Sequence, residues 1–412
     1  GRLKRYGFNV PAGGVLVADA YRDFIEENNL LEDMGKITRI ITTGNIGDKE
    51  IEQKLLSFRE KIKAGHIPSS VRDELEGKLK TIGILAKPVA VRSSATAEDS
   101  GKASFAGIHQ SFLNVRGFDN ILSAIKECYA SLWTPRSVAY RRKMNFKDNE
   151  VGQAVVIMVM VVAEAAGVGF TCDPRTGRED VVLINANFGL GESVVSGSVE
   201  PDEYRLNYRW EVTERWEVTE KKIGRKEGKT IAGSNGGTEF VTSAGSSLKQ
   251  VLTDGNIRKL NLLIQRVFDA LGCGEQHQDI EWVFDGRNFF LVQARPATAL
   301  PRNTLDEIKN QPEIWSNTNL KDTMPMVQST LNWSLLEKIY KATPKPLIKL
   351  DTPDRSGFRS ARLYHGRAYF NMSMQQWIMY DDFGVTPRQM NEALGGHQPV
   401  IEINERKPYR GI

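Results

Sequence analysis

Two acidic residues, an amide and an arginine lie close together between positions 279 and 295, in the stretch DIEWVFDGRNFFLVQAR. They are Asp279, Glu281, Gln293 and Arg295. Carboxylate and amide oxygens are hard ligands that suit Mg²⁺, and a guanidinium can bind a phosphate through two hydrogen bonds. These residues therefore indicate a site for magnesium and phosphate. An acid–arginine pair that only stabilises an ordinary hairpin explains them equally well, since polar groups on an apolar hairpin must be solvated or paired.

The same stretch has the pattern of a β-hairpin, with polar and apolar residues alternating before a turn at Asp285-Gly286. We predict a three-residue loop, 285–287, because an odd loop puts Glu281 and Gln293 on one face. Asp279 is then opposite Gln293, and Glu281 is opposite Leu291. One face of the return strand is expected to carry Phe289, Leu291, Gln293 and Arg295.

Three further stretches contain residues that could contact a ligand. A predicted strand, 88–92, ends in Arg92 and leads into a loop of small residues, 100–107, whose N–H groups could approach an anion. By itself this loop is better interpreted as an ordinary surface loop, since it matches no phosphate-binding fingerprint. The stretches AGVGFTCDPRTG and NFGLGESVVSGSVEPDEYRL are also weak alone, although Glu192 in the second could reach a ribose or a metal.

Composition restricts the class of protein. The 412 residues are 40% hydrophobic and 26% charged, which suits two or three globular domains. A net charge of +4, with no basic run interleaved with aromatics, argues against nucleic acid as a partner. The apolar run 154–162 is too short to cross a bilayer, so no membrane partner is expected. Three cysteines without metal spacing favour a reducing compartment, and we expect a cytoplasmic protein.

Periodicity predicts the elements that position these residues. Helices are predicted at 20–27 (capped by Asp19), at 46–79 with a break near Pro68, at 118–142 with a break at Thr134-Pro135, and at 254–271. Strands are predicted at 14–17, 88–92, 151–162, 167–171, 181–186 and in PDEYRL. The tandem copies of RWEVTE, at 209–214 and 215–220, are expected to lengthen an exposed hairpin. The glycine- and serine-rich segment 222–247 is expected to be mobile.

Taken in order, several motifs resemble one family. They are VRSSATAEDS, SFAG, SLWTPRSVAYR, AGVGFTCDP, GLGESVVSG with EPDEY, and QDIEWVF…LVQARP. Over residues 7–300 the chain is similar to the nucleotide-binding domain of the phosphoenolpyruvate synthase (pyruvate, water dikinase) and pyruvate phosphate dikinase family. This resemblance implies an α+β, ATP-grasp fold of two lobes that clamp ATP. We expect an N-terminal lobe at 1–115, a C-terminal lobe at 116–300, and a linker and partial, mainly helical domain at 301–412.

The resemblance also implies roles for individual residues. Arg92 and Arg295 match catalytic arginines at the phosphates, and Asp279, Glu281 and Gln293 match residues that hold Mg²⁺. The residues implied to bind ATP are Arg92, Arg136, Glu192, Asp279, Glu281, Gln293 and Arg295. The family's glycine-rich segment with a phosphate-binding lysine is expected to precede Gly1. Met158 stands where the family commonly has glutamine, and His277, where a proline is frequent, is expected to be structural.

In this family ATP phosphorylates a histidine on a separate swivelling domain, which carries the phosphoryl group to pyruvate. None of the five histidines of this chain lies in a matching motif, so the phosphohistidine domain and the acceptor domain are expected elsewhere in the full-length protein. The segment from Trp315 resembles the region that follows the ATP domain in synthase-like and rifampicin phosphotransferase-like members. Two alternatives remain, namely transfer to an antibiotic or other hydroxyl acceptor, and a non-catalytic nucleotide-binding module.

Overall fold

The computed structural model describes residues 1–42, 44–95, 111–144, 146, 151–209, 215–242, 248–318, 320–321, 324–329, 331–333, 335–336 and 358–403. Its helices are α1 (Arg2–Arg5), α2 (Ala18–Glu27), α3 (Leu31–Ile40), α4 (Lys49–Ala64), α5 (Ser69–Thr81), α6 (Phe118–Ser131), α7 (Pro135–Lys143), α8 (Glu192–Val195), α9 (Asp254–Gly272), α11 (Met372–Phe383) and α12 (Pro387–Ala393). Its strands are β1 (Gly13–Leu16), β2 (Val89–Ala95), β3 (Ser111–Val115), β4 (Gln153–Val159), β5 (Ala165–Phe170), β6 (Val181–Phe188), β7 (Asp202–Arg209), β8 (Arg215–Lys222), β9 (Gly228–Ala232), β10 (Thr238–Thr242), β11 (Gln278–Phe284), β12 (Phe289–Pro296), β13 (Trp315–Ser316), β14 (Ala361–Tyr364) and β15 (Arg367–Asn371).

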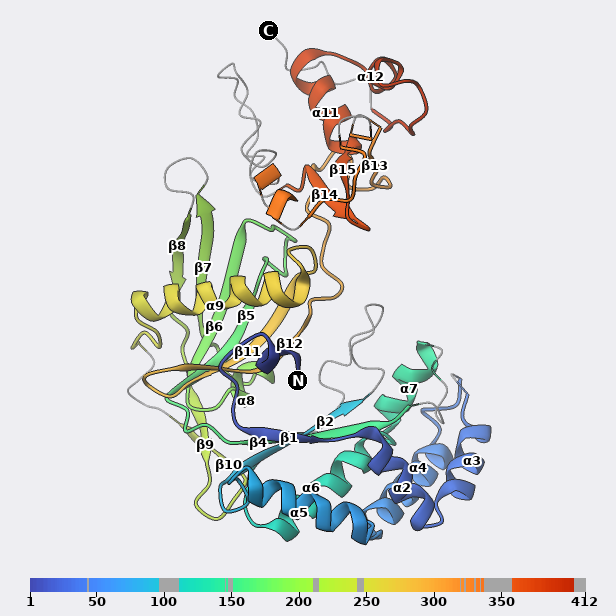
Figure 1. The fold of residues 1–412 in the computed structure, drawn as a ribbon, viewed down its shortest axis with the longest axis vertical. Coiled ribbons are helices and arrows are strands. Elements are labelled where there is room, and N and C mark those ends of the chain that lie inside the picture. The colour runs from blue at the N-terminus through green and yellow to red at the C-terminus, as the bar shows by residue number, and fades with distance from the viewer. Residues whose placement is uncertain are drawn as a thin grey trace.

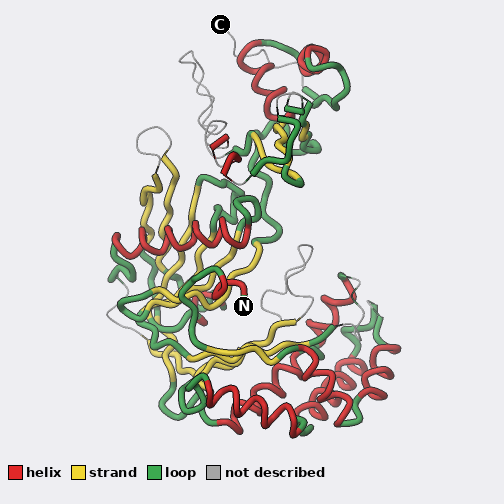
Figure 2. Tube along the Cα trace, viewed as in Figure 1, coloured by secondary structure: helices red, strands yellow, loops and turns green. Residues whose placement is uncertain are grey.

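These elements form a mixed α+β structure with several antiparallel sheets (Figure 1). We call β1–β4 with α2–α7 the N lobe, and the sheet β12-β11-β5-β6-β7-β8 with α1, α8 and α9 the C lobe. Elements β13–β15, α11 and α12 make up the C-terminal unit. Figure 2 shows most of the helices gathered on the N lobe, whereas the C lobe is mainly strand.

The N lobe is a four-stranded antiparallel sheet, ordered β1-β4-β2-β3, with helices packed against one face. Apolar side chains such as Phe58, Ile125 and Trp133 fill the space between. The break predicted at Pro68 is confirmed, since α4 and α5 are separate helices and Pro68 is the N-cap of α5. The interruption predicted at Thr134-Pro135 is confirmed as well, because α6 ends before it and Pro135 starts α7.

Strand β4 lies between β1 and β2, although it follows both in the chain. Together with α6 and α7 it packs into the N-lobe core. Pairing between strands that are distant in the chain leaves no local signal, so sequence pattern did not predict this order.

The predicted cap of the first long helix is wrong. Helix α2 begins at Ala18 with Val17 at the N-cap, and no side chain caps it. Asp19 lies inside the first turn, where its Oδ1 accepts a hydrogen bond from Arg22 Nη1 at 3.2 Å. A carboxylate there still interacts favourably with the positive end of the helix dipole.

The C lobe is a six-stranded antiparallel sheet crossed on one face by α9 (Figure 1). Ile257, Leu260 and Ile264 of α9 pack in the same core as Trp282 of β11. Helix and strand meet closely at Gly169, because a Cβ there would lie 2.5 Å from Ile264 Cδ1. The glycine of AGVGF at this position therefore serves packing.

The first residues of the chain pack on the C lobe before the chain enters the N lobe. Phe8 is buried in the C-lobe core. The Asn9 side chain donates to Phe289 O at 2.9 Å, and Asn9 O accepts from Leu291 N at 2.9 Å. Residue 9 thus runs along β12, one of the two strands with candidate ligand-binding residues.

Strands β7 and β8 form the hairpin predicted from the repeated RWEVTE, with Arg209 opposite Arg215. Residues 210–214, most of the first copy, lie outside the described residues. Segment 222–247 differs from expectation, since its residues 228–242 form the antiparallel hairpin β9–β10. Asn114 of the N lobe secures that hairpin, donating to Gly233 O at 2.7 Å and Gly237 O at 2.9 Å.

The C-terminal unit contains a three-stranded sheet, β13-β15-β14, as well as α11 and α12. Two small apolar clusters lie within it, one around Trp377 and one around Trp333. The described part of this unit thus combines two helices with a small sheet of short strands. No helix in the described part of the chain is long and apolar enough to cross a membrane.

Candidate functional site

Arg92 of the N lobe joins the two sheets. Its Nη2 atom donates to Glu281 Oε2 at 2.7 Å and to Gln293 Oε1 at 2.8 Å. Glu281 is on β11 and Gln293 is on β12, directly opposite each other in the C-lobe sheet. The side chains of Arg92 and Glu281 are only 20% and 17% exposed, so this ion pair is largely shielded from water. One predicted site residue of the N lobe, Arg92, therefore meets two of the C lobe, Glu281 and Gln293.

A second acid–arginine pair lies beside it on the same hairpin. Arg295 donates to Asp279 Oδ2 through Nε at 2.8 Å and through Nη2 at 2.6 Å. The other carboxylate oxygen of Asp279, Oδ1, is buried without a hydrogen-bond partner. Burial raises the pKa of Asp279 above its ordinary value, and the positive charge of Arg295 offsets this only in part. One acceptor oxygen therefore remains open to a cation or a donor.

The hairpin loop predicted from the sequence is wrong. Phe284 pairs with Phe289, which leaves a four-residue loop, 285–288. Asp285 Oδ1 accepts from the backbone N–H of Arg287 at 2.8 Å and of Asn288 at 2.6 Å. An aspartate that accepts from the N–H groups two and three positions later stabilises a longer turn than the Asp-Gly dipeptide indicated.

The predicted cross-strand pairs are also wrong, and a β-bulge explains why. The register shifts between Glu281 and Trp282, so that Val292 is an extra residue on β12. Glu281 is opposite Gln293 and Asp279 is opposite Arg295. A loop with an even number of residues would place Glu281 and Gln293 on opposite faces of the hairpin. The extra residue, Val292, returns them to the same face.

The same bulge divides the return strand between two faces. Leu291 is opposite Trp282 and buried in the C-lobe core, and the partly buried Phe289 packs against the same core. Gln293 and Arg295 instead face the two acids. The expectation that all four of these residues share a face is therefore wrong.

The oxygen donors at this site come from the side chains of Asp279, Glu281 and Gln293. In the described ranges no group of three or more His, Cys, Asp or Glu side chains is arranged to hold a metal. Two carboxylates and an amide oxygen nevertheless suit Mg²⁺, which commonly uses one or two carboxylates together with phosphate and water. The unpartnered Oδ1 of Asp279 fits this role, while the oxygens of Glu281 and Gln293 accept from Arg92. The residues fit a cation that arrives with a phosphate for Arg92.

Arg136 does not join this cluster. It is exposed on α7, and its side chain makes no hydrogen bond or ion pair with described residues. Several residues of its SLWTPRSVAYR motif are buried, among them Trp133 and Arg141. The Arg141 guanidinium lies 5.4 Å from the Trp133 ring centre, and Trp133 Nε1 donates to Tyr21 OH at 2.9 Å. Part of this motif therefore supports the N-lobe core.

Glu192 lies apart from the cluster too, at the start of α8. It lines a cavity of about 500 Å³ between β3, α6 and the turn of the β9–β10 hairpin. Ser111, in the same lining, accepts a hydrogen bond from Arg92 Nε at 3.3 Å. The cavity therefore adjoins Arg92. The predicted anion-binding loop 100–107 lies outside the described residues.

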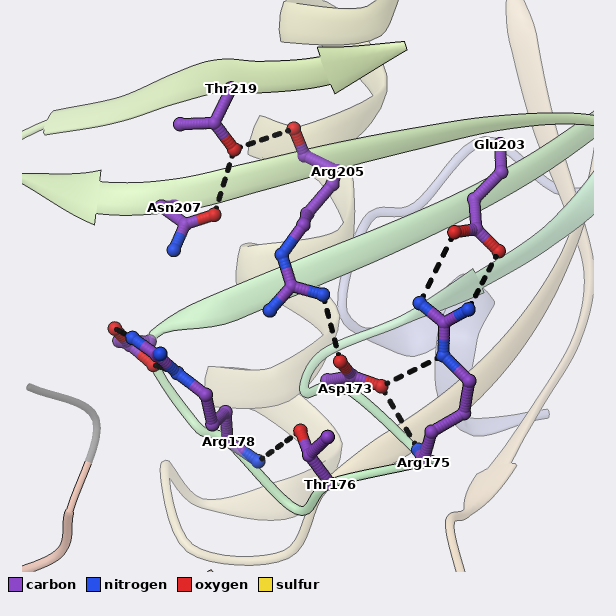
Figure 3. A network of polar contacts seen from close by, with 9 residues as sticks. Asp173, Arg175, Thr176, Arg178, Glu203, Arg205, Asn207 and Thr219 are labelled. Carbon is purple, nitrogen blue, oxygen red and sulfur yellow. Dashed lines mark hydrogen bonds and ion pairs between the residues drawn. The ribbon is translucent and has the colours of Figure 1, made fainter. Parts of the chain in front are cut away.

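The CDPRTG motif forms a turn held by its own charges (Figure 3). Asp173, 1% exposed, accepts from Arg175 N at 2.9 Å and from Arg205 Nη1 at 2.8 Å. Burial alone would raise the pKa of Asp173, but these hydrogen bonds outweigh it and hold the pKa below its ordinary value. The Arg175 guanidinium also pairs with Glu203 of β7 at 3.1 Å. These charges neutralise one another and fix the turn to the sheet.

The EPDEY motif is likewise structural. Asp202 is fully buried and forms an ion pair with Lys226. Its carboxylate also accepts from Tyr204 OH at 2.8 Å, from Val251 N at 2.8 Å and from Gly224 N at 3.0 Å. A buried charge with this many donors is well compensated. Sequence spacing gave no indication that Lys226 would be its partner.

Comparisons with known proteins show the family of this chain. The family model described as pyruvate phosphate dikinase, AMP/ATP-binding domain, matches residues 1–314. Phosphoenolpyruvate synthase of Aquifex aeolicus is 38% identical over 325 residues, covering 74% of this chain and 37% of that protein. A probable phosphoenolpyruvate synthase of Pyrococcus abyssi is 34% identical over 357 residues, covering 76% of this chain and 42% of that protein.

Rifampicin phosphotransferase of Bacillus cereus is 39% identical over 301 residues, covering 71% of this chain and 32% of that protein. The chain spans less than half the length of each of these relatives. The matched region contains both lobes and the candidate site. This chain belongs to the pyruvate phosphate dikinase AMP/ATP-binding domain family.

Proposed function

We propose that this chain is the ATP-binding part of a phosphoenolpyruvate synthase-like phosphotransferase. It binds Mg-ATP between an N lobe and a C lobe of ATP-grasp type and presents the nucleotide to a histidine on a separate swivelling domain. That domain, in the full-length protein, passes the phosphoryl group to pyruvate. The observation that carries the proposal is the contact of Arg92 with Glu281 and Gln293, because it unites cationic and oxygen-donor side chains from both lobes.

The proposed role of each residue follows from its charge. Arg92 and Arg295 bind phosphate oxygens and neutralise their charge, while Asp279, Glu281 and Gln293 supply oxygen ligands. A bound Mg²⁺ would polarise the phosphates and offset the charge that develops during transfer. Phosphoryl transfer depends mainly on positioning and electrostatic stabilisation, which such an arrangement provides.

Binding requires an exchange of partners at this site. In the free chain each guanidinium pairs with a carboxylate. Arg92 and Arg295 become available to phosphate when the carboxylates obtain another counter-charge. A magnesium–nucleotide complex brings that positive charge and the phosphates together, so the total charge stays balanced.

Calorimetric titration of Mg-ATP into the 412-residue chain tests the proposal, with Glu281→Ala as the site variant. Glu26→Ala is the matched control, since Glu26 is an exposed carboxylate on α2. We expect saturable binding to the wild type and the control, and none to Glu281→Ala. Equal binding by Glu281→Ala would place the nucleotide elsewhere.

A second candidate function follows from the comparison with rifampicin phosphotransferase, which is as similar to this chain as the synthases are. In that case the final acceptor is a hydroxyl group of an antibiotic. Assays of the full-length protein with pyruvate and with a panel of hydroxylated antibiotics separate the two. A non-catalytic nucleotide-binding module would turn over ATP with neither acceptor.

A further inference from the structure

Arg359 attaches the C-terminal unit to the C lobe. It precedes β14, and its Nε donates to Glu179 Oε2 at 2.6 Å while its Nη1 donates to Glu275 Oε2. The side chain of Arg359 is only 16% exposed, and those of Glu179 and Glu275 are 24% and 28% exposed. The backbone N–H of Leu363 also donates to Glu275 Oε1 at 3.3 Å. One cation thus bridges two carboxylates at a largely buried junction.

Both carboxylates face the positive charge of Arg359 at this junction. Burial would raise the pKa of Glu179, but the charge of Arg359 and the nearby His277 ring lower the pKa to about 2. Removing one partner of a buried ion pair leaves an uncompensated charge, which is strongly unfavourable. Without Arg359, Glu179 and Glu275 lose the positive charge that they share.

Glu275 and His277 belong to the segment that leads directly into β11. His277 Nε2 lies 3.5 Å from Glu179 Oε1, and its ring stacks on Phe268. On its other side, His277 Nδ1 is hydrogen-bonded to Thr171 Oγ1 at 3.0 Å. His277 is therefore buried among Phe268 of α9, Thr171 and Glu179, and Glu179 is one of the two carboxylates that pair with Arg359.

From Thr171 the contacts continue into the site hairpin. Thr171 Oγ1 accepts from Gln278 N at 2.9 Å, and Thr171 N donates to Gln278 O at 3.2 Å. Gln278 is opposite Pro296 in the hairpin register, next to the Asp279–Arg295 pair. A continuous set of contacts therefore runs from Arg359 to the base of the hairpin.

We propose that Arg359 is a positioning residue for the nucleotide site, coupling the docking of the C-terminal unit to the placement of Asp279 and Arg295. The inference rests on the proposed Mg-ATP function. By pairing with Glu179 and Glu275, Arg359 holds the start of β11 in place. Coupling between sites is reciprocal, so Mg-ATP binding must also strengthen docking of the unit by the same factor.

Two measurements on the 412-residue chain test this, namely the Kd for Mg-ATP and hydrogen exchange in β14 with and without Mg-ATP. Arg359→Ala is the main variant. Arg362→Ala is the matched control, because Arg362 also lies on this segment but stacks on Trp315 within the unit, 4.5 Å from the ring centre. We expect Arg359→Ala to raise the Kd about tenfold, within the usual range for coupled sites. Arg362→Ala should keep the wild-type Kd.

The effect of Mg-ATP on hydrogen exchange in β14 is the second readout. If Arg359 only held the C-terminal unit on the C lobe, Mg-ATP would not change this exchange. Mg-ATP should slow exchange in β14 of the wild type and of Arg362→Ala, and should have no effect in Arg359→Ala. If Arg359→Ala does not fold, Glu275→Gln decides, because it keeps the acceptor for Leu363 N but removes a charge from the bridge. That variant should raise the Kd in the same direction by a smaller factor.

The outcomes separate this inference from the proposed function. A wild-type Kd in Arg359→Ala, or in Glu275→Gln if the first variant does not fold, overturns the inference while the proposed function stands. A wild-type chain that binds no Mg-ATP overturns both. A raised Kd without the change in β14 exchange also overturns the coupling, because reciprocity would be violated.

Discussion

Arg92 Nη2 lies 2.7 Å from Glu281 Oε2, and this contact spans 189 positions of the chain and two separate sheets. Under the proposed function, Arg92 and a divalent cation would compete for the oxygens of Glu281. In the structure, an arginine of the N lobe supplies the positive charge for Glu281 of the C lobe. The two lobes are linked through the residues proposed to bind Mg-ATP.

Arg92→Ala should have opposite effects on nucleotide and on free metal. The variant loses a phosphate contact, so Mg-ATP binding should fall sharply, whereas the oxygens of Glu281 and Gln293 lose their competitor. Titration with Mn²⁺ in the absence of nucleotide should then show tighter binding than in the wild type. Removing a charged hydrogen bond should also lower the free energy of unfolding by about 1.5–3 kcal/mol.

Arg92→Lys is the control, because it keeps a positive charge but not the forked geometry that reaches two acceptors. It should bind Mn²⁺ more weakly than Arg92→Ala does. Equal Mn²⁺ affinity in wild type and Arg92→Ala would show that Arg92 does not compete with a cation.

Deleting Val292 should destroy the site without removing any of its polar residues. The deletion removes the bulge, so Gln293 and Arg295 shift by one position and turn towards the C-lobe core. We expect loss of Mg-ATP binding by calorimetry and a lower melting temperature. Val292→Ala, which keeps the extra residue, should bind nearly as the wild type does. Wild-type affinity in the deletion variant would contradict the role given to the bulge.

Asp279→Asn should be more stable, relative to the wild type, as the pH rises. The folded-state pKa of Asp279 is raised, chiefly by burial. Its contribution to stability is therefore present below the pKa of the unfolded chain and is lost as the pH rises through the folded-state value. From about pH 3.9 towards neutrality, the melting temperature of the wild type should fall relative to that of Asp279→Asn. Mg-ATP binding should be lost in the variant.

Asp285→Asn supplies a control with the opposite sign. Hydrogen bonds from the backbone N–H groups of Asn288 and Arg287 lower the pKa of Asp285. Its contribution is present above the unfolded-state pKa and is lost as the pH falls through the folded-state value. The wild type should therefore gain stability relative to Asp285→Asn as the pH rises. A pH-independent difference for Asp279→Asn would contradict the raised pKa.

Asp202→Asn should destabilise the C lobe strongly. It leaves the fully buried Lys226 without its counter-charge, and breaking such pairs costs about 3–5 kcal/mol. Urea denaturation measures the change. Asp254→Asn is the comparison, since the Lys221–Asp254 pair is partly solvated and should matter little. Similar midpoints for the two variants would contradict the structural role assigned to EPDEY.

The local sequence pattern alone was enough to predict many of the helices and strands of this protein. The spacing of Ile257, Leu260 and Ile264 predicted helix α9, and Pro68 predicted the break between α4 and α5, because helix period and proline geometry act within a few residues. The alternation of polar and apolar residues before Asp285-Gly286 likewise predicted the hairpin of β11 and β12.

The cross-lobe pairing of Arg92, the bulge at Val292 and the bridge made by Arg359 were decided only by the tertiary structure. Each depends on groups far apart in the sequence or on a register that local alternation cannot specify, since one extra residue exchanges the two faces of a strand. The same holds for Asp202 and Lys226, whose burial is tolerable only because the fold brings them together. Sequence determined which side chains could do the chemistry, and long-range packing determined which of them meet.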